Sequence, residues 1–355
     1  MGHALFRTDR IAAPRGGLCA CPPTPGPRDK GAPETVNKRP IVVIPSDDPV
    51  QCQGSPRLDE LRKRADVRLF TDRCSSVEEQ LKRAHGAVAV INSRSYVKWP
   101  AEVMQKLPDL KFIAVCGIGT DSIDKPAARK LGITVSNLPG RTAPVVAEHA
   151  FGLMFAVAKR ATWHTDQLRA GNWAKMDMVL LQGKTVGIIG AGPIGAHMAK
   201  LCRGIGMKVL GWTFHPSAER GRQLGIEFVP MDDLLRRSDV VSLHLPGTEE
   251  SKKLLGRREI GLMKPGAILV NTGRGVLVDE AALVESLNAG RLTGAGLDVF
   301  EQEPLPKGSP ITKCQQVVLT PHVADMTPEG LDLLNQGVVE NTLAFLDGKP
   351  QNVVN

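Results

Sequence analysis

The sequence predicts an α/β protein built from two doubly wound parallel sheets. Short apolar runs alternate with amphipathic segments along most of the chain, as in repeated β-α-β units. The runs are continuous rather than alternating, which is typical of strands that helices cover on both faces. A length of 355 residues, 42% of them hydrophobic, favours two domains over one.

The first series of units is expected from about residue 40 to residue 137. Its predicted helices cover 58–64 and 77–83. Its predicted strands are Ile41–Ile44, Val67–Phe70, Ala87–Ile91, Phe112–Val115 and Ile133–Val135. Each run is four or five residues or shorter and contains β-branched side chains, as short buried strands do.

Residues 1–39 differ from the rest because they are rich in proline and glycine and show no periodic apolar pattern. Such a segment cannot bury enough apolar surface to fold, so we expect a disordered N-terminal extension. A transit peptide is an alternative because the segment has several arginines and few acids, although it lacks the amphipathic period of one. A misassigned start codon is a third alternative, since the folded pattern begins near Arg39.

A second series of units begins near Thr185. Its predicted strands are Val186–Ile189, Val209–Trp212, Val240–Leu243, Ile268–Val270 and Val317–Leu319, with helices near 193–206, 231–237, 256–262 and 279–289. Between the two series, 145–172 is predicted to be helical, and an amphipathic helix over 328–346 closes the chain. Large apolar residues between Trp163 and Trp173 suit packing either on a partner subunit or between domains.

Composition excludes several classes of function. The formal net charge is +8 and the sequence pI is near 9.2, but basic and acidic residues are interspersed, whereas a nucleic-acid-binding face needs clustered basic residues. Seven scattered cysteines without a C-x-x-C pair indicate a reducing, cytoplasmic setting and no metal site. No apolar run approaches the ~18 residues of a membrane span. The basic balance suits an anionic substrate and cofactor.

The strongest motif is a glycine loop that follows one predicted strand and opens a helix. It reads Gly190-Ala191-Gly192-Pro193-Ile194-Gly195. In such a loop the first glycine permits a tight turn, the second lets backbone approach a pyrophosphate, and the third lets helix pack on strand. Amides at the start of the helix then face the phosphate charge. Because strand, glycines, helix and second strand occur in this order, we predict a bound dinucleotide.

The position that chooses between NAD and NADP lacks its usual acid. An Asp or Glu at the end of the second strand normally binds the ribose 2′-hydroxyl, but here Thr213 stands there and no acid occurs before Glu219. Thr213 can bind a hydroxyl without repelling a 2′-phosphate, and His215, Arg220 and Arg222 could attract one. The cofactor is therefore expected to be NAD or NADP.

Three later predicted strands end in charged side chains. Arg274 follows one strand, Asp298 and Glu303 follow another, and His322 follows a third. The carboxyl ends of strands are where open α/β sheets bind ligands, and an arginine, an acid and a histidine are the set of side chains needed for 2-oxoacid reduction. Each also has a structural alternative: Arg274 as a helix cap, Glu303 as a solvated side chain and His322 as a hydrogen-bonded core residue.

Taken together, these segments resemble the D-isomer-specific 2-hydroxyacid dehydrogenase family. The resemblance runs from about residue 41 to the end, through Gly117–Asp121, Gly190–Gly195, Asn271–Glu280, Leu297–Pro304 and Thr320–His322. It implies a Rossmann cofactor domain at 138–321 inserted into a flavodoxin-like substrate domain made of 40–137 and 322–355. It also implies a homodimer through the helices of Val145–Trp173 and an active site in the cleft.

The resemblance implies roles for single residues as well. His322 would be the general acid/base with Glu303 as its partner, and Arg274 would grip the substrate carboxylate and carbonyl. Backbone amides of Ile118 and Gly119 would hold the other carboxylate oxygen. The implied cofactor contacts are Gly190, Gly192, Pro193, Ile194, Gly195, Thr213, Pro246, Ser251, Thr272, Gly273, Arg274, Asp298, His322 and Ala324. Among them, Asp298 would bind the nicotinamide carboxamide.

The most specific expectation is a glyoxylate/hydroxypyruvate reductase-like enzyme, since no second anion clamp is evident. A D-3-phosphoglycerate dehydrogenase-like enzyme is the runner-up. Members that act on phosphoglycerate often read R-S-R-T where this chain reads Asn92-Ser93-Arg94-Ser95, and the missing first arginine weakens that reading. A non-catalytic NAD(H)-sensing co-regulator is a third reading, which the polar extension would support. Gly273 replaces the alanine or threonine usual in the family.

Overall fold

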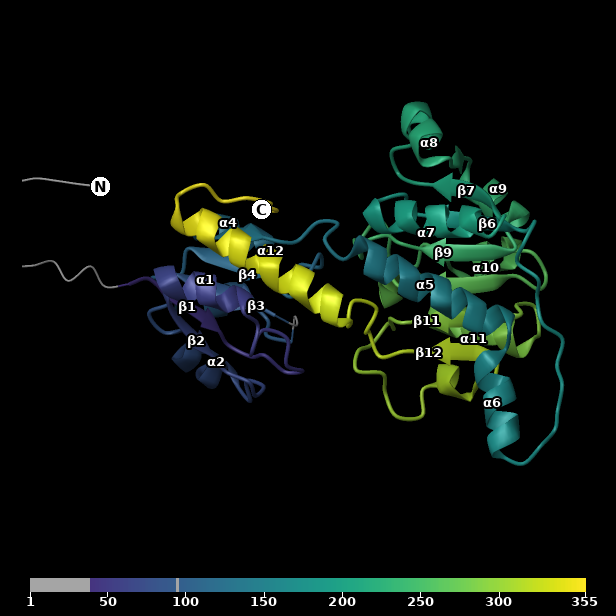
Figure 1. The fold of residues 1–355 in the computed structure, drawn as a ribbon, viewed down its shortest axis with the longest axis horizontal. Helices are drawn as coiled ribbons and strands as arrows, with labels where there is room; N and C mark the ends of the chain where they lie inside the picture. The colour runs from purple at the N-terminus through teal and green to yellow at the C-terminus, as the bar shows by residue number, and fades with distance from the viewer. Residues whose placement is uncertain (1–38, 94–95) are drawn as a thin grey trace, which may run out of the picture. The chain divides into compact units, whose positions relative to one another are not determined.

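The computed structural model of the chain describes residues 39–93 and 96–355. The segment 1–38, which covers nearly all of the expected disordered extension, lies outside the described residues, as do Arg94 and Ser95. The described residues form two parallel-sheet α/β domains (Figure 1), which confirms the predicted fold class. None of the described helices is long and apolar enough to span a lipid bilayer.

The first domain contains a five-stranded parallel sheet with the strand order β2-β1-β3-β4-β5. Its strands are β1 (Ile41–Ile44), β2 (Asp66–Leu69), β3 (Ala89–Asn92), β4 (Phe112–Val115) and β5 (Thr134–Ser136). The helices α1 (Arg57–Arg64), α2 (Val77–Ala84), α3 (Ala101–Met104) and α4 (Lys125–Lys130) connect them. The order 2-1-3-4-5 is that of flavodoxin-like folds.

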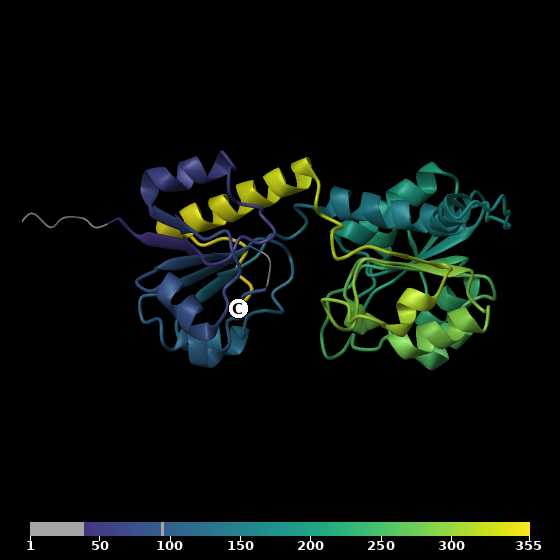
Figure 2. The same ribbon diagram turned by 90° about the horizontal axis from the view of Figure 1, so that it is seen from below.

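A helix from the C-terminal end of the sequence, α12 (Pro328–Leu346), completes the core of this first sheet. Thr327 caps it by accepting a hydrogen bond from the amide of Gly330 at 3.0 Å. The ring of Phe345 stacks on Phe112 of β4, with 4.5 Å between ring centroids. Figure 2 shows α1 and α12 together on one face of the sheet.

The second domain contains a seven-stranded parallel sheet with the order β12-β11-β10-β9-β6-β7-β8. Its strands are β6 (Thr185–Ile189), β7 (Lys208–Trp212), β8 (Glu227–Phe228), β9 (Val240–Leu243), β10 (Ile268–Asn271), β11 (Gly294–Leu297) and β12 (Val317–Leu319). Its helices are α5 (Ala143–Ala158), α7 (Pro193–Gly204), α8 (Ala218–Leu224), α9 (Met231–Arg237), α10 (Arg257–Leu262) and α11 (Glu280–Asn288). Counted from β6, this is the Rossmann order 3-2-1-4-5-6 with a seventh strand at the edge.

The helical stretch expected over 145–172 is interrupted. It consists of α5 and α6 (Ala161–Arg169), because Arg160 between them has a left-handed backbone with φ 48°. Residues 170–184 form no helix or strand, so Trp173 lies outside the helix in which it was expected, with 84% of the residue exposed. The expectation also missed α3, α4, α8 and β8.

Candidate active site

The polar side chains singled out from the sequence follow the strands of the second sheet. The glycine loop follows β6, Arg274 lies shortly after β10, Asp298 directly follows β11, and His322 lies shortly after β12. All these strands are parallel, so their carboxyl ends meet at one edge of the sheet. The fold therefore gathers residues that are far apart in the sequence.

The glycine loop is closely packed at its first and third glycines and open at the second. Gly190 has φ 96°, and a Cβ atom there would lie 2.8 Å from the carbonyl oxygen of His244. A Cβ atom at Gly195 would overlap the carbonyl oxygen of Gly190, whereas one at Gly192 would meet no atom within 4 Å. Helix α7 begins at Pro193 with no side-chain cap. This open backbone at a helix N-terminus fits a dinucleotide pyrophosphate.

Two buried polar atoms near the same edge have no hydrogen-bond partner. They are Nδ1 of His244, which follows β9, and Oγ1 of Thr272, which follows β10. Burial lowers the pKa of His244 to about 3, so the imidazole is neutral, and its Nε2 lies 2.9 Å from Oγ of Ser242. Buried polar groups normally find partners. Unpaired atoms at this edge are therefore further support for a bound cofactor, and His244 is a residue that the sequence reasoning missed.

The segment after β7 brings one arginine to the glycine loop. Nη2 of Arg220 donates a hydrogen bond to the carbonyl oxygen of Ala191 at 2.5 Å. Arg222 instead pairs with Glu219 at 2.5 Å, and His215 is exposed. Thr213 directly follows β7 and is partly buried. Of the three basic residues expected near the adenosine ribose, Arg220 is thus the one hydrogen-bonded to the loop.

Other residues expected at the cofactor lie in local turns. Oγ of Ser251 donates to the carbonyl oxygen of Pro246 at 2.8 Å and accepts from the amide of Thr248 at 2.8 Å. Ile194 lies in the first turn of α7 and is partly buried. The amide of buried Gly273 donates to Oδ1 of Asn271 at 3.0 Å, which shapes the turn before Arg274.

Arg274 reaches from the second sheet to the loop that follows β4 of the first sheet. Its Nε donates to Oδ2 of Asp121 at 3.1 Å, and its Nη1 donates to the carbonyl oxygen of Gly273 at 2.8 Å. A Cβ atom at Gly119 would overlap Nη2 of Arg274. The guanidinium therefore lies against the loop that carries Ile118 and Gly119. Asp121, to which it is paired, is a contact that the sequence reasoning did not assign.

His322 is paired with Glu303. The distance from Nδ1 of His322 to Oε2 of Glu303 is 2.7 Å, and Oε1 of Glu303 accepts the amide of Phe300 at 3.0 Å. The hydrogen bond to Glu303 raises the pKa of His322 despite partial burial. For Glu303, burial alone would raise the pKa, but the hydrogen bond from His322 and the charge of Arg274 leave it lowered. An ionised carboxylate only accepts, so Nδ1 carries a hydrogen and Nε2 is the atom left for proton exchange.

The alternative acid in this segment has a different partner. The carboxylate of Glu301 lies 3.7 Å from Nζ of Lys253, on a largely exposed surface. Glu303 is therefore the residue that contacts the histidine. The positive charge of Arg274 acts on the pKa of both His322 and Glu303, lowering each. Guanidinium, imidazole and carboxylate all follow neighbouring parallel strands that end at one edge of the sheet.

Asp298 holds the turn that contains His322. Its Oδ1 accepts the amide of Val323 at 3.0 Å and its Oδ2 accepts the amide of Ala324 at 3.1 Å. Its carbonyl oxygen accepts the amide of His322 at 2.8 Å. Asp298 is 1% exposed, and Oγ1 of Thr320 donates to its Oδ1 at 2.6 Å. Most of the accepting positions of this carboxylate are therefore occupied by the protein itself.

In chemical terms, the strand ends bring together a planar cation, a histidine with a raised pKa and an open glycine loop. The cation can grip a carboxylate through two parallel hydrogen bonds. The histidine can give a proton to a developing alkoxide. Within the residues that the structure describes, no group of three or more His, Cys, Asp and Glu side chains is arranged to hold a metal ion.

Comparison with known proteins places the chain among dehydrogenases. Residues 151–324 match the model of the D-isomer specific 2-hydroxyacid dehydrogenase NAD-binding domain. A glyoxylate reductase of Korarchaeum cryptofilum is 42% identical over 262 residues, which is 72% of this chain and 79% of the relative. A glycerate dehydrogenase of Methylorubrum extorquens is 40% identical over 288 residues, which is 78% of this chain and 88% of the relative.

A solved structure of the same architecture contains a bound cofactor. The acyclic imino acid reductase Bsp5, in complex with NADPH and D-Arg, matches with a TM-score of 0.81 and 29% identity. The match covers 89% of this chain and 100% of that one. Its two-domain arrangement is therefore shared over nearly all of the described residues.

Proposed function

The chain belongs to the D-isomer specific 2-hydroxyacid dehydrogenase family, and we propose that its preferred substrates are glyoxylate and hydroxypyruvate. It is an NAD(P)-dependent oxidoreductase that exchanges a hydride with C2 of a small 2-oxoacid or 2-hydroxyacid. One observation carries the assignment of the site: Arg274, after β10, lies against the Gly119 loop, and the hydrogen-bonded pair of His322 and Glu303 follows the neighbouring strands at the same sheet edge. A small acid at this point would meet all three side chains.

The cofactor would lie along the edge formed by the glycine loop and the ends of β9, β10 and β11. Gly190, Gly192 and Gly195 would hold the pyrophosphate, with Pro193 and Ile194 opening the helix beneath it. Thr272, Gly273 and Pro246 would line the ribose and nicotinamide end, with Ser251 fixing the loop of Pro246. A bound nicotinamide supplies the hydride that C2 accepts during reduction. The unpaired Oγ1 of Thr272 supports this placement.

Arg274 would bind and polarise the substrate. Its fork presents several N–H donors in one plane, so it can hold one carboxylate oxygen and the carbonyl oxygen together. The amides of Ile118 and Gly119 would hold the second carboxylate oxygen. As negative charge develops on the carbonyl oxygen, the guanidinium stabilises it without having to reorient. Binding and charge stabilisation thus come from one group.

His322 would donate the proton that completes reduction. Because Nδ1 is bonded to Glu303, the donated proton leaves from Nε2. The raised pKa of His322 increases the protonated fraction near neutral pH, which favours the reductive direction. In oxidation the same nitrogen would accept a proton from the hydroxyl group. Asp298 would hold this turn in place and face the carboxamide of the nicotinamide with its remaining accepting position.

The choice of substrate is testable with a kinetic matrix of two cofactors against several oxoacids. NADH and NADPH would each be assayed with glyoxylate, hydroxypyruvate, pyruvate and 3-phosphohydroxypyruvate, following absorbance of the reduced nicotinamide. We expect the highest kcat/KM with glyoxylate or hydroxypyruvate. A preference for the phosphorylated acid would favour the D-3-phosphoglycerate dehydrogenase-like reading instead. Cofactor binding in calorimetry without turnover of any oxoacid would favour the NAD(H)-sensing co-regulator.

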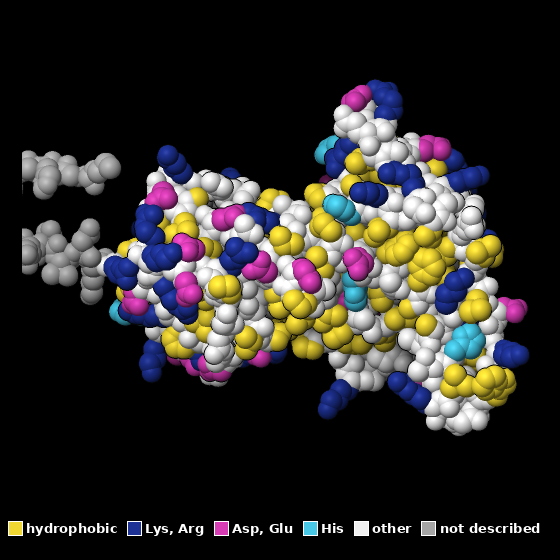
Figure 3. Space-filling model, in the orientation of Figure 1, with side chains coloured by type: hydrophobic (Ala, Val, Ile, Leu, Met, Phe, Trp, Pro, Cys, Tyr) yellow, Lys and Arg dark blue, Asp and Glu magenta, His cyan; other side chains and the backbone are white. Residues whose placement is uncertain are grey.

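The enzyme is proposed to work as a homodimer. Five apolar residues on α6 and the segment after it are exposed: Leu168 at 56%, Trp173 at 84%, Met176 at 38%, Met178 at 59% and Leu180 at 66%. We call them the 168–180 patch. Figure 3 shows hydrophobic side chains gathered on the domain that carries α5 and α6. A second copy that offers the same patch would bury these side chains in a two-fold contact.

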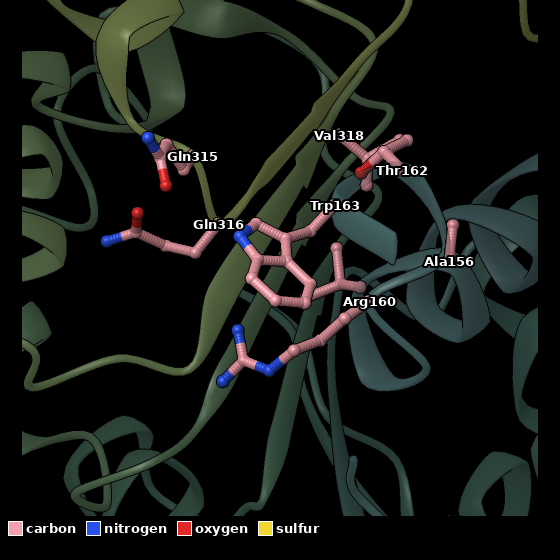
Figure 4. Close-up of a pocket in the computed structure, with 8 residues that line it drawn as sticks. Ala156, Arg160, Thr162, Trp163, Gln315, Gln316 and Val318 are labelled. Carbon is pink, nitrogen blue, oxygen red and sulfur yellow. The ribbon is translucent and has the colours of Figure 1, made fainter. Parts of the chain in front are cut away.

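A hollow near this surface is too small to be the substrate site. It lies between the α5–α6 corner and the edge of β12, where Trp163, Arg160 and Gln316 line it (Figure 4). Its volume is about 10 Å³, which is room for about one water molecule. We therefore assign this region to subunit contact rather than to catalysis.

Domain limits and compartment complete the proposal. We propose a substrate domain of 40–137 plus 322–355 and a cofactor domain of 138–321. In support, one limit falls between β5 and α5 and the other between β12 and α12, outside any helix or strand. The cytoplasm is the proposed location, because Cys52, Cys74, Cys116, Cys202 and Cys314 are all free thiols, as is usual in reducing compartments.

A further inference from the structure

A histidine outside the catalytic set is linked to it by hydrogen bonds. His149 lies on α5, and its Nε2 is 3.0 Å from Oγ1 of Thr320, the residue after β12. The same hydroxyl is 2.6 Å from Oδ1 of Asp298, the residue after β11. Nε2 of His149 is also 3.5 Å from that carboxylate oxygen. One short chain of polar contacts thus joins three elements of the second domain.

The direction of each hydrogen bond follows from the number of protons available. A threonine hydroxyl has one hydrogen, and an ionised carboxylate has none to give. Thr320 therefore donates to Asp298, and its oxygen must accept from His149. Nε2 of His149 consequently carries the hydrogen in this arrangement. The side chain of His149 is 25% exposed and that of Asp298 is 1% exposed, so the chain runs from the surface into the core.

Asp298 lies at the buried end of this chain of hydrogen bonds and holds the backbone at His322 and at the two residues that follow it. It accepts the amides of Val323 and Ala324 through its side chain and the amide of His322 through its carbonyl oxygen. The backbone of His322 has φ 55°, a left-handed conformation that side-chain-bearing residues adopt rarely. Such a conformation persists when its surroundings determine it. A rotation of the Asp298 carboxylate would release two of these bonds.

We propose that His149 is a positioning residue for the reaction: its Nε2–H fixes the Thr320 hydroxyl, which fixes the Asp298 carboxylate and thereby the orientation of His322. The proposal rests on the proposed catalytic role of His322. Electrostatics agree with it. Burial alone would raise the pKa of Asp298, but the hydrogen bonds from His149 and Thr320 and the amide of Val323 leave it lowered, so the carboxylate stays an acceptor.

Replacement of His149 by two amides of different length tests the proposal. His149→Gln places an amide N–H near the position of Nε2, whereas His149→Asn has the same group one methylene shorter and places it near the position of Nδ1. We expect His149→Asn to lower kcat about 10- to 100-fold, as small misplacements of catalytic groups do. KM for the oxoacid should change little, because Arg274 and the Gly119 loop are not part of this chain of hydrogen bonds. His149→Gln should recover most of the lost kcat.

A second pair of variants acts on the other partner in the same chain. Thr320→Ser keeps the hydroxyl and should retain kcat, while Thr320→Val removes it and should lose kcat as His149→Asn does. His149→Asn and Thr320→Val break the same chain of hydrogen bonds. The kcat of the variant that carries both changes should therefore be little lower than that of Thr320→Val alone. Additive losses would contradict the proposal. Melting temperatures of all variants identify any that fail to fold, and the conclusion then rests on the other pair.

A spectroscopic readout separates this proposal from the proposed function. The full-length protein with ¹³C-labelled histidine would be titrated by NMR, with the His322 signal assigned by its loss in His322→Gln. His149→Asn should lower the pKa of His322 toward its ordinary value, and His149→Gln should not. If the wild type turns over no oxoacid, the proposed function fails, and this titration still decides the role of His149. An unchanged pKa and kcat in His149→Asn, or equal damage by Gln and Asn, would overturn it.

Discussion

The imidazole of His322 and the carboxylate of Glu303 form a hydrogen bond of 2.7 Å between Nδ1 and Oε2, although 48% of the histidine side chain is exposed to solvent. The two partners are held independently, since the Glu303 carboxylate also accepts the amide of Phe300 and the Asp298 carboxylate binds the turn that follows His322. The pair is therefore fixed at the surface of the sheet edge, where a substrate can reach it.

Replacement of the histidine should separate catalysis from cofactor binding. His322→Ala removes the proton donor, and general acids of this kind contribute about 10²- to 10⁴-fold in rate. We expect kcat to fall within that range while the Kd for NADH or NADPH, measured by fluorescence titration, stays within about twofold. His85→Ala, at an exposed position after α2, is the control and should retain full activity. Near-normal kcat in His322→Ala would exclude this residue as the acid.

The pH dependence of reduction should follow the protonated fraction of His322. Because the pKa of His322 is raised above 6.5, kcat/KM for an oxoacid should remain high to a pH above 6.5 and then fall about tenfold per pH unit. Glu303→Gln removes the negative charge, so the pKa of His322 falls and the descending limb moves to lower pH. Initial rates from pH 5 to 10 measure the descending limb in the wild type and in Glu303→Gln. A limb that moves to higher pH would contradict the pairing.

The raised pKa of His322 also predicts how the stability of the fold changes with pH. A histidine whose folded pKa is raised stabilises the fold fully below its unfolded pKa, near 6.5, and that contribution is lost as the pH rises through the folded value. Chemical denaturation at pH 5.5 and pH 9 should therefore show a larger difference between wild type and Glu303→Gln at the lower pH. An equal difference at both pH values would contradict the linkage.

A single methyl group at Gly119 should disturb the arginine. A Cβ atom there would overlap Nη2 of Arg274, so Gly119→Ala must displace the guanidinium or the loop. We expect kcat/KM to fall at least roughly tenfold, since the substrate clamp loses its geometry. Gly261→Ala is a matched control, because a Cβ atom on that α10 residue meets no atom within 4 Å. It should leave activity unchanged and raise the free energy of unfolding by about 0.5–1 kcal/mol.

The residue after β7 should control the cofactor preference. Thr213→Asp would place a carboxylate where the ribose 2′-substituent is expected, and it would repel a 2′-phosphate. We expect kcat/KM with NADPH relative to NADH to fall roughly tenfold, which is about 1.4 kcal/mol. Thr71→Asp, an exposed change in the other domain, is the control. An unchanged ratio would mean that residue 213 does not face the ribose.

A charge in the 168–180 patch should separate the subunits. Trp173 is the most exposed residue of the patch, so Trp173→Glu should shift the molar mass measured by light scattering from dimer toward monomer. Val77→Glu changes a 46% exposed apolar residue on α2 and should leave the mass unchanged. A wild-type protein that elutes as a monomer at micromolar concentration would exclude the dimer.

The sheets were predictable because their strands are continuous apolar runs covered on both faces. Ile268–Val270 and Val240–Leu243 are examples, and both are strands with almost no exposure. Because the strands were predictable, the points where they end were predictable too. Arg274, Glu303 and His322 could therefore be identified as residues that follow strand ends. The break at Arg160 could not be anticipated, because a left-handed arginine has no signature in local composition.

The contacts across elements were also beyond the reach of the sequence. His149 lies 171 residues from Thr320, and Asp121 lies 153 residues from Arg274. Neither pair has a spacing that a local pattern could reveal, because tertiary packing alone brings them together. His244 is an intermediate case: it directly follows β9 as Asp298 directly follows β11, and that position could have marked it.

The return of α12 to the first sheet has a consequence for synthesis of the protein. Phe112 emerges from the ribosome 233 residues before Phe345, the ring that covers it (345 − 112 = 233). At a translation rate of about 5–20 residues per second, the apolar surface around Phe112 lacks its contact with α12 for about 10–50 s. During this interval chaperones can bind the exposed apolar face of the first sheet. A chain that ends before Phe345 should therefore be prone to aggregation, because this apolar face of the first sheet stays uncovered.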